Sequence, residues 1–264
     1  MNCRLCNSSN LFLLYTQGNQ DEFRFYRCRR CQLVNYDLSG GLDQAKYARE
    51  YVDPFDPAPK LNLAQTLSFD SFRSFLPQPG RMLEIGCGNG RLLLLAREAG
   101  WSVRGLELSS FLAESLHARL GIDVEVADFL HYQPAQPEPY DAVILRHVLE
   151  HLPDSRGAMT CLHALLREGG HVMLEFPNID GLDLRFKRFL RRRGVHRKRY
   201  PPDYRPGHCN EFNHASFCYL LRETGFSLIS WQTYSYRWIS NRVFTTWPIG
   251  NKARVILRKV ACSA

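Results

Sequence analysis

Residues 83–90, which read LEIGCGNG, constrain the fold of this chain more than any other segment. They form an apolar strand with an acid, Glu84, near its end, followed by glycines at every second position. Glycines adopt backbone conformations that a Cβ atom forbids, and they let a ligand approach the main chain where the next helix begins. The pattern therefore predicts a strand, a tight turn and a helix that together hold a nucleotide-type cofactor.

Two further segments carry acids at expected strand ends. Residues 103–107 (VRGLE) predict a second strand that ends at Glu107, and residues 124–129 (VEVADF) predict a third strand that contains Asp128. An acid at the end of the second strand suits a ribose, because the two ribose hydroxyls are hydrogen-bond donors. Dinucleotide sites share this acid, but their fingerprint is Gly-x-Gly-x-x-Gly, whereas the spacing here is Gly-x-Gly-x-Gly.

From residue 81 onward, short apolar segments alternate with helical patterns. This alternation implies parallel βαβ units with helices on both faces of the sheet, which is an α/β fold. Strands are expected at residues 82–85, 103–107, 124–129, 142–145, 171–176 and 226–231. Helices are expected to begin after Gly90, Ser109, Asp154 and Asn213, the first three ending at Gly100, Gly121 and Gly169-Gly170.

These motifs together resemble the class I S-adenosylmethionine (SAM) dependent methyltransferases of types 11 and 23. The first motif of that class looks like residues 83–90, and its fourth-strand region looks like residues 140–154 (YDAVILRHVLEHLPD). The resemblance covers roughly residues 72–226. It implies a Rossmann-like sheet of seven mostly parallel strands with helices on both faces, in which residues 254–260 form a seventh, antiparallel strand.

The resemblance also assigns a cofactor site. It places Glu84 and the glycine loop at the methionine end of SAM, Glu107 at the ribose, Asp128 and Phe129 at the adenine edge, and two residues of strand four at the methyl-transfer position. A second interpretation of Asp128 is a helix cap or turn acid. The implied cofactor residues are Glu84, Gly86, Cys87, Gly88, Gly90, Glu107, Asp128, Phe129, Leu145 and Arg146.

Residues 146–151 (RHVLEH) follow strand four, where open parallel sheets bind substrates. His151 is a candidate general base, because an imidazole titrates near neutrality. His208 stands after strand five much as a histidine does in ubiquinone-pathway O-methyltransferases and in plant small-RNA 2′-O-methyltransferases. We predict His151, His208 and Glu150 as catalytic residues; the other interpretation is that Glu150 and His151 form a structural turn.

A divalent metal at this place is a further hypothesis. In the plant small-RNA family, two acids and two histidines bind a metal beside the acceptor hydroxyls. The matching positions here are His147, Glu150, His151 and His208. His147 replaces an acid of that pattern, which makes the ligand set softer than a magnesium site. Without a metal, His208 would be a substrate contact or a base.

Two cysteine pairs, Cys3-x-x-Cys6 and Cys28-x-x-Cys31, mark the start of the chain. No secretory signal precedes them, so the spacing is better explained by metal binding than by disulfides, and four thiolates close a tetrahedral zinc site. The opposing interpretation is that these cysteines are unrelated. We expect a zinc ribbon over residues 1–38, with a strand at 23–26, a linker and cap over 39–78 with helices at 43–51 and 61–76, and a methyltransferase domain over 79–264.

The formal net charge of +8 is concentrated in one segment. Residues 185–199 hold nine cations and no acid, so the remaining chain has a net charge of −1 (+8 minus 9). Any attraction for anions is therefore local, and no broad basic face for a nucleic-acid duplex is indicated. We interpret the insertion at 179–212 as a basic lid, in which these cations are a solvated helix face, a grip on an anionic substrate, or a contact for RNA or a membrane surface.

The sequence thus predicts a SAM-dependent methyltransferase that acts on a small molecule, either a sugar nucleotide or another biosynthetic metabolite. The first competing hypothesis is an RNA methyltransferase, against which stands the lack of an Asn-Pro-Pro-Tyr-like motif after strand four. The second is a non-catalytic binding module with the same fold. No apolar run approaches membrane-spanning length, and we expect a cytoplasmic protein without a transmembrane segment.

Overall fold

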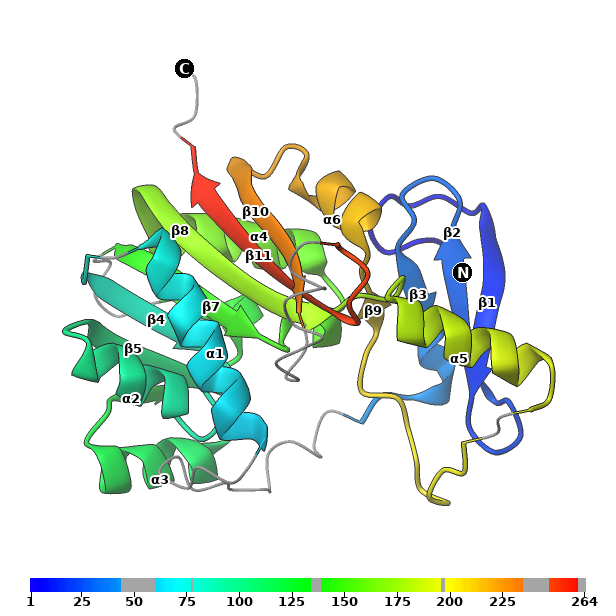
Figure 1. Ribbon diagram of the computed structural model, residues 1–264, viewed down its shortest axis with the longest axis horizontal. Coiled ribbons are helices and arrows are strands. Elements are labelled where there is room, and N and C mark those ends of the chain that lie inside the picture. Colours follow the sequence, from blue (N-terminus) through cyan, green and yellow to red (C-terminus); the bar gives the residue numbers. More distant parts are fainter. Residues whose placement is uncertain (44–59, 77, 134–138, 196–197, 235–246, 261–264) are drawn as a thin grey trace.

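The computed structural model describes residues 1–43, 60–76, 78–133, 139–195, 198–234 and 247–260, so most of the helix expected at 43–51 lies outside the described residues. The described chain forms two sheets. A seven-stranded sheet has the order β10-β11-β8-β7-β4-β5-β6, and a four-stranded sheet has the order β1-β2-β3-β9. Figure 1 shows the two sheets on opposite sides of the molecule, with β9 between them.

The large sheet confirms the predicted fold class. Its strands run parallel except β11, which pairs antiparallel with both β8 and β10, as expected for the seventh strand. The strands are β4 (Arg81–Ile85), β5 (Ser102–Glu107), β6 (Val124–Val126), β7 (Tyr140–Arg146), β8 (Leu166–Pro177), β10 (Phe226–Tyr234) and β11 (Lys252–Lys259). The connecting elements are α1 (Lys60–Phe75), α2 (Arg91–Glu98), α3 (Ser110–Leu120), η3 (Phe129–His131), η4 (Leu149–His151), α4 (Ser155–Leu165) and α6 (His214–Leu221).

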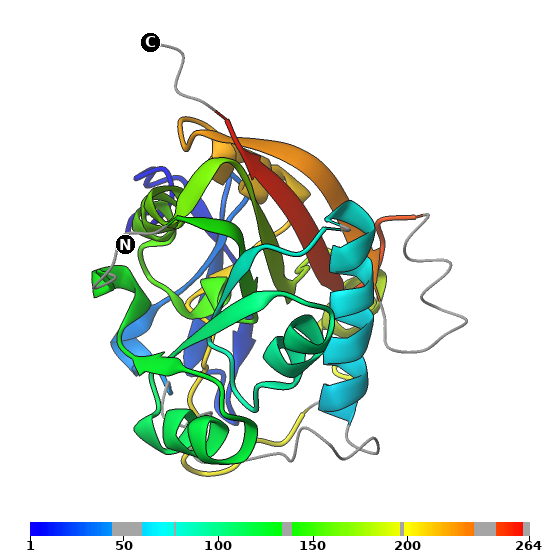
Figure 2. The ribbon, with the colours of Figure 1, turned by 90° about the vertical axis from the view of Figure 1, so that its left-hand side faces the viewer.

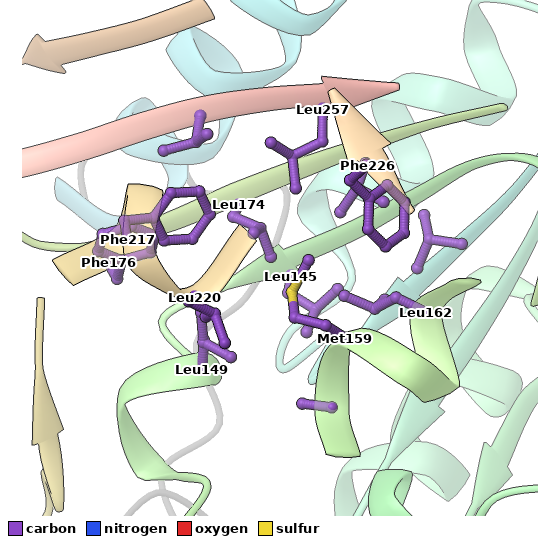
Figure 3. Close-up of a cluster of buried hydrophobic side chains, with 14 of the residues drawn as sticks. Leu145, Leu149, Met159, Leu162, Leu174, Phe176, Phe217, Leu220, Phe226 and Leu257 are labelled. Atoms are coloured by element: carbon purple, nitrogen blue, oxygen red, sulfur yellow. The ribbon is translucent and has the colours of Figure 1, made fainter. Parts of the chain in front are cut away.

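Alternating side chains of the central strands give the large sheet two apolar faces. In β7, Ala142 and Ile144 belong to one core cluster, and Val143 and Leu145 belong to the other. This period of two is the geometry of a strand buried on both sides. Helices α1 and α2 cover the first face, and α1 runs along the sheet in Figure 2. Helices α4 and α6 cover the second face, whose cluster is drawn in Figure 3.

Most predicted helix boundaries are confirmed by their caps. The side chains of Ser109, Asp154 and Asn213 each accept a backbone N–H at the start of α3, α4 and α6. The prediction that Gly169-Gly170 ends α4 is wrong. Helix α4 ends at Leu165, and β8 begins directly at Leu166. The two glycines lie inside β8, where its register with β7 shifts and where Gly169 has φ +72°, so they shape a bulge.

The small sheet joins the start of the chain to the insertion after β8. It consists of β1 (Leu11–Gln17), β2 (Phe23–Cys28), which contains the strand predicted at 23–26, β3 (Val34–Tyr36) and β9 (Asn210–Glu211). The short η1 (Leu38–Gly40) follows β3, and α5 (Leu182–Arg192) lies beside this sheet in Figure 1. Among the described residues, no helix combines the length and the apolar composition that a membrane span requires.

A buried ion-pair network ties four elements together beneath the carboxyl edge of the large sheet. Glu175 of β8 accepts from Arg146 Nε of β7 at 2.8 Å and from Arg254 Nε of β11 at 2.6 Å. Ser68 of α1 donates to the same carboxylate at 2.8 Å. Burial opposes ionisation of Glu175, but the two guanidinium groups prevail and lower its pKa to about 2. The carboxylate therefore holds two buried cations and the helix α1 in place.

We expect Glu175→Gln to destabilise the protein by about 3–5 kcal/mol, because it leaves two buried guanidinium groups without their counter-charge. Urea unfolding measures this loss. Since the pKa of Glu175 is lowered by folding, its contribution is complete above the pKa of the unfolded carboxyl, about 4.3, and is lost as the pH falls toward 2. The control is Glu168→Gln on the same strand, whose exposed carboxylate pairs with Lys259 at 3.3 Å. Equal stability losses in the two variants would contradict this role of Glu175.

Candidate active site and metal centre

The glycine loop has the conformation that its sequence predicts. Gly86, Gly88 and Gly90 have φ values of +69°, +54° and +74°, in the left-handed region that residues with a Cβ atom rarely adopt. A Cβ atom on Gly86 or Gly90 would lie 2.6 Å from a neighbouring side-chain carbon, whereas one on Gly88 would meet no atom within 4 Å. The loop is thus tightly packed at both ends and faces open space in the middle, where a ligand can approach the backbone.

Two of the strand-end acids, Glu107 and Glu84, lie beside this loop. Glu107 accepts from Gly88 N at 3.0 Å and from Leu108 N at 2.9 Å, so the expected ribose ligand also orders the glycine loop. Glu84 is buried, which raises its pKa to about 8. Its Oε2 atom is buried and has no hydrogen-bond partner among the described residues. A cationic group of a ligand would satisfy this carboxylate.

The structure gives the other predicted cofactor residues distinct surroundings. Asp128 caps η3 by accepting from Leu130 N at 3.0 Å, which agrees with its interpretation as a cap or turn acid, although half of its side chain is exposed. The side chains of Cys87 and Phe129 are buried in apolar clusters. Leu145 points into the cluster of Figure 3, and Arg146 pairs with Glu175. The side chains of these four residues, Cys87, Phe129, Leu145 and Arg146, are thus packed or paired inside the protein.

Three buried amide side chains that the sequence did not indicate as functional connect α1 to the glycine loop. Asn89, inside the loop, donates to Asn62 Oδ1 at 2.8 Å and accepts from Gln65 Nε2 at 2.9 Å. All three are nearly fully buried. The sequence signal that could have found them is the polar residues at positions 62 and 65, on the side of α1 that also carries Phe69 and Phe72. Helix α1 therefore packs on the sheet and also positions the cofactor loop.

The predicted catalytic residues come together beyond the carboxyl end of β7. The ligand atoms of Glu150, His151 and His208 all lie within 4.8 Å of one another, and the rings of the two histidines meet edge to face with centroids 4.8 Å apart. His151 Nδ1 lies 2.8 Å from the carbonyl of Gly207, which accepts its proton and so fixes Nε2 as the unprotonated nitrogen of the neutral ring. His147 Nδ1 lies 3.2 Å from Glu150 Oε1 but outside the three-residue group.

Burial governs the electrostatics of this cluster. It lowers the pKa of His208, an effect that Glu150 partly offsets. For the buried Glu150, the cost of burial is outweighed by the hydrogen bond from His147 and by the charges of three histidines, so its pKa is lowered. Its Oε2 has no hydrogen-bond partner among the described residues. The cluster therefore favours the ionised form of Glu150, while burial disfavours the charged form of His208.

The cluster of Glu150, His151 and His208 and the glycine loop are neighbours. Val148, two residues before Glu150, approaches Gly86 so closely that a Cβ atom on this glycine would lie 2.6 Å from Val148 Cγ2. On the other side, Cys209 N donates to the carbonyl of Glu150 at 3.0 Å, which fixes His208 beside η4. A ligand on the glycine loop is thus adjacent to the segment that carries His151, against which the segment of His208 is held.

The four cysteines predicted as zinc ligands also come together, and all are free thiols. Cys3 Sγ lies 3.4 Å from Cys31 Sγ, and Cys6 Sγ lies 3.5 Å from Cys28 Sγ. Zn–S bonds of about 2.3 Å in a tetrahedron place the sulfurs about 3.8 Å apart, so the four thiols fit a zinc ion with little movement. The hydrogen bond from Cys31 lowers the pKa of Cys3 despite its burial, and Asn35 Nδ2 donates to Cys3 Sγ at 3.6 Å.

The two knuckles share one backbone geometry. Asn7 N donates to the carbonyl of Cys3 at 2.9 Å, and Gln32 N donates to that of Cys28 at 3.0 Å. Asn7 and Gln32 have φ values of +55° and +66°, at the position where zinc knuckles often have glycine. Asparagine tolerates this conformation better than most residues. The absence of glycine therefore does not prevent the knuckle turns from forming.

A seven-stranded sheet of this order, with a glycine loop and strand-end acids at its carboxyl edge, defines a class I SAM-dependent methyltransferase. The sequence profile described as a methyltransferase domain matches residues 59–230. The chain belongs to this methyltransferase family, as its resemblance predicted. The match begins at residue 59, just before α1, so it includes the helix that packs on the sheet.

Two relatives with assigned names are ubiquinone biosynthesis O-methyltransferases. The ubiquinone biosynthesis O-methyltransferase of Ralstonia nicotianae is 29% identical over 134 residues, which cover 48% of this chain and 56% of that protein. The protein of the same name from Xylella fastidiosa is 26% identical over 150 residues, covering 54% of this chain and 61% of the relative. The alignments thus span little more than half the length of these relatives.

A solved structure with the same fold is the 1,6-didemethyltoxoflavin-N1-methyltransferase of Burkholderia thailandensis, which contains 1,6-didemethyltoxoflavin and S-adenosylhomocysteine. It superposes with a TM-score of 0.56 at 19% identity and covers 75% of this chain and 79% of that chain. At 19% identity, the similarity establishes the shared fold and does not identify the methyl acceptor of this chain.

We expect Gly88→Arg to abolish SAM binding, measured by titration calorimetry, because its side chain would enter the open space at the centre of the loop. The control is Gly121→Arg, since Gly121 also has a positive φ, +58°, and no atom within 4 Å of an added Cβ. The control thus reproduces the backbone strain at the end of α3, away from the loop. Unchanged SAM affinity in Gly88→Arg would overturn the cofactor assignment.

We expect Cys28→Ser to lower the zinc content of the purified protein and to destabilise the small sheet, because zinc binding is coupled to folding. Metal analysis and thermal unfolding measure the two effects. Cys161→Ser is the matched control, since Cys161 is a partly buried thiol of α4 outside the cysteine cluster. A full zinc complement in Cys28→Ser would contradict the zinc site.

Proposed function

We propose that this protein transfers a methyl group from SAM to an oxygen of a small-molecule acceptor, a sugar nucleotide or another biosynthetic metabolite. The family supports methyl transfer, and the O-methyltransferase names of the relatives favour oxygen as the acceptor atom. The observation that carries the proposal is the contact between the cofactor loop at Gly86 and the segment of Val148, Glu150 and His151. It brings the candidate bases to the place where a methyl donor would bind.

The residues proposed to hold SAM are those around the open centre of the loop. Glu84 would receive a cationic group of the methionine end, Glu107 the ribose hydroxyls, and Asp128 the adenine edge. Bound SAM would supply a methyl group on a positively charged sulfonium, which makes that carbon electrophilic. The contribution of the protein is to align the acceptor with this carbon and to remove the proton of the acceptor hydroxyl.

His151 is the proposed base. Its Nδ1–H is held by the Gly207 carbonyl at 2.8 Å, so Nε2 is the nitrogen that can accept a proton. Glu150 would stabilise the imidazolium that results, because its carboxylate lies within 4.8 Å. His208 shares the cluster, and burial lowers its pKa, so it would contact the acceptor or take over as base.

A divalent metal is a second proposal for the same cluster. Glu150, His151 and His208 present one carboxylate and two imidazoles within 4.8 Å, a set that suits zinc, iron or nickel better than magnesium. A bound metal would lower the pKa of an acceptor hydroxyl instead of a histidine removing its proton. This second proposal requires a metal content that survives Cys28→Ser and is lost in His208→Ala.

Several cations of the basic insertion pair with groups of the protein itself. This weakens the hypothesis that the insertion grips an anionic substrate. Arg191 pairs with Asp21 at 2.5 Å, Lys187 pairs with Asp183 at 2.7 Å, and Arg192 donates to the carbonyl of Leu14 at 3.1 Å. Through Arg191 and Arg192, α5 docks on the small sheet. The same contacts weaken the hypothesis of an RNA methyltransferase, because they engage charges that a phosphate backbone would require.

Methyl transfer from labelled SAM into an extract of the source organism tests the proposal. We expect label in the small-molecule fraction, reduced at least about 100-fold by His151→Gln, as for the loss of a general base, with unchanged SAM affinity. His117→Gln, at an exposed histidine of α3, is the control. Label in RNA would establish an RNA methyltransferase. SAM binding without label in any fraction would favour the binding module.

A further inference from the structure

A cavity of about 150 Å³ lies between the small sheet and the segment that leads into β9. Its wall includes Gln17 and Phe25 of the small sheet and Tyr204, Arg205, His208 and Glu211 of the insertion. His208 is also a member of the cluster with Glu150 and His151. The cavity and the candidate catalytic cluster therefore share a wall.

Glu211 gives this cavity a chemical preference. Its Oε1 accepts from the Tyr15 hydroxyl at 2.7 Å, while Oε2 is buried and has no hydrogen-bond partner among the described residues. A buried acceptor without a donor costs about 1–3 kcal/mol, so a ligand in the cavity that donates to the Glu211 side chain would recover part of this cost. Burial raises the pKa of Glu211 to about 7, an effect limited by the Tyr15 hydrogen bond and by Arg188 and Arg27.

The size of the cavity limits the ligand to one ring. An apolar protein cavity of about 150 Å³ holds benzene. Here Gln17, Arg205 and Glu211 supply polar groups, so a ring that carries hydroxyls fits better than a bare hydrocarbon. The opposite charges of Arg205 and Glu211 face the same space, which gives no preference for an anion.

We propose that this cavity binds the acceptor through a single ring with neighbouring hydroxyl groups, one donating to the Glu211 side chain and another lying beside His208. The identification of this ring as the methyl acceptor rests on the proposed function. The small sheet then supplies part of the substrate specificity, through Gln17 and Phe25, in addition to its zinc site. A monosaccharide and an aromatic diol share the chemistry that the cavity requires.

Ligand-detected NMR on the full chain tests this proposal. The probes are methyl α-D-glucopyranoside and catechol, with anisole as a ring that lacks neighbouring hydroxyls. We expect one of the two hydroxylated rings to bind at millimolar concentration and anisole to bind at least about tenfold more weakly, since anisole has no hydroxyl to donate to a buried acceptor whose missing donor costs about 1–3 kcal/mol. The preferred ring distinguishes a sugar from an aromatic acceptor. Binding of neither ring would overturn the proposal.

Two variants locate the binding at Glu211. Glu211→Gln should weaken binding of the preferred ring about tenfold, because it replaces one accepting oxygen of the side chain with an NH2 donor. Tyr15→Phe, which removes the hydroxyl that orients Glu211 from outside the cavity lining, should weaken it less. Glu22→Gln, at an exposed acid between β1 and β2, is the control and should leave binding unchanged. Ring binding that is insensitive to Glu211→Gln and Tyr15→Phe would overturn the assignment.

SAM affinity, measured by calorimetry on the same proteins, separates the two proposals. We expect it to remain unchanged in Glu211→Gln and Tyr15→Phe, which also shows that both variants are folded. Failure of the wild-type protein to bind SAM would contradict the proposed function. Ring binding would then still decide whether the cavity holds a hydroxylated ring. Normal SAM binding without any ring binding would remove the cavity proposal alone.

Discussion

The pairing of β3 with β9 links the small sheet to the candidate active site. Only Val34 with Glu211 and Asn35 with Asn210 take part, yet this short ladder joins the start of the chain to the segment that carries His208. Arg4, between the two cysteines of the first knuckle, reinforces it. Its Nε donates to Asn210 Oδ1 at 3.0 Å, and its terminal nitrogens donate to the carbonyls of Tyr36 and Cys209.

This arrangement places the cysteine cluster and the catalytic cluster in one network. Cys3 and Cys28 pack in the same apolar cluster as Leu149 and Met159, which belong to the catalytic turn and to α4. Arg156 of α4 also donates to the carbonyl of Leu5, within the first knuckle, at 3.2 Å. Coupling between sites travels through contiguous packing and hydrogen bonds of this kind. Order in the knuckles, which zinc binding would supply, therefore reaches Cys209 and Asn210, directly after His208.

The sequence predicted those features of the fold and the site that depend on residues close together in the chain. The glycine loop at 83–90, the helix caps and the two knuckles follow from backbone preferences within a few residues of each position. The features that were missed or wrong depend on distant partners. The ion pairs of Glu175 come from β7 and β11, and the two-residue β9 has no apolar period of its own. The bulge at Gly169 arises because β8 must match β7, which a pattern read along one segment cannot reveal.

Three buried carboxylates, Glu84, Glu150 and Glu211, lack a full set of hydrogen-bond partners within the described protein. Each has one oxygen without a hydrogen-bond partner among the described residues, and native proteins leave few such atoms. Glu175, equally buried, has its carboxylate fully engaged by Arg146, Arg254 and Ser68. The contrast separates two uses of a buried acid. Glu175, whose carboxylate oxygens all have hydrogen-bond partners, holds the sheet together. Glu84, Glu150 and Glu211 lie at the glycine loop, at η4 and at the cavity, where a ligand would supply the missing hydrogen bond.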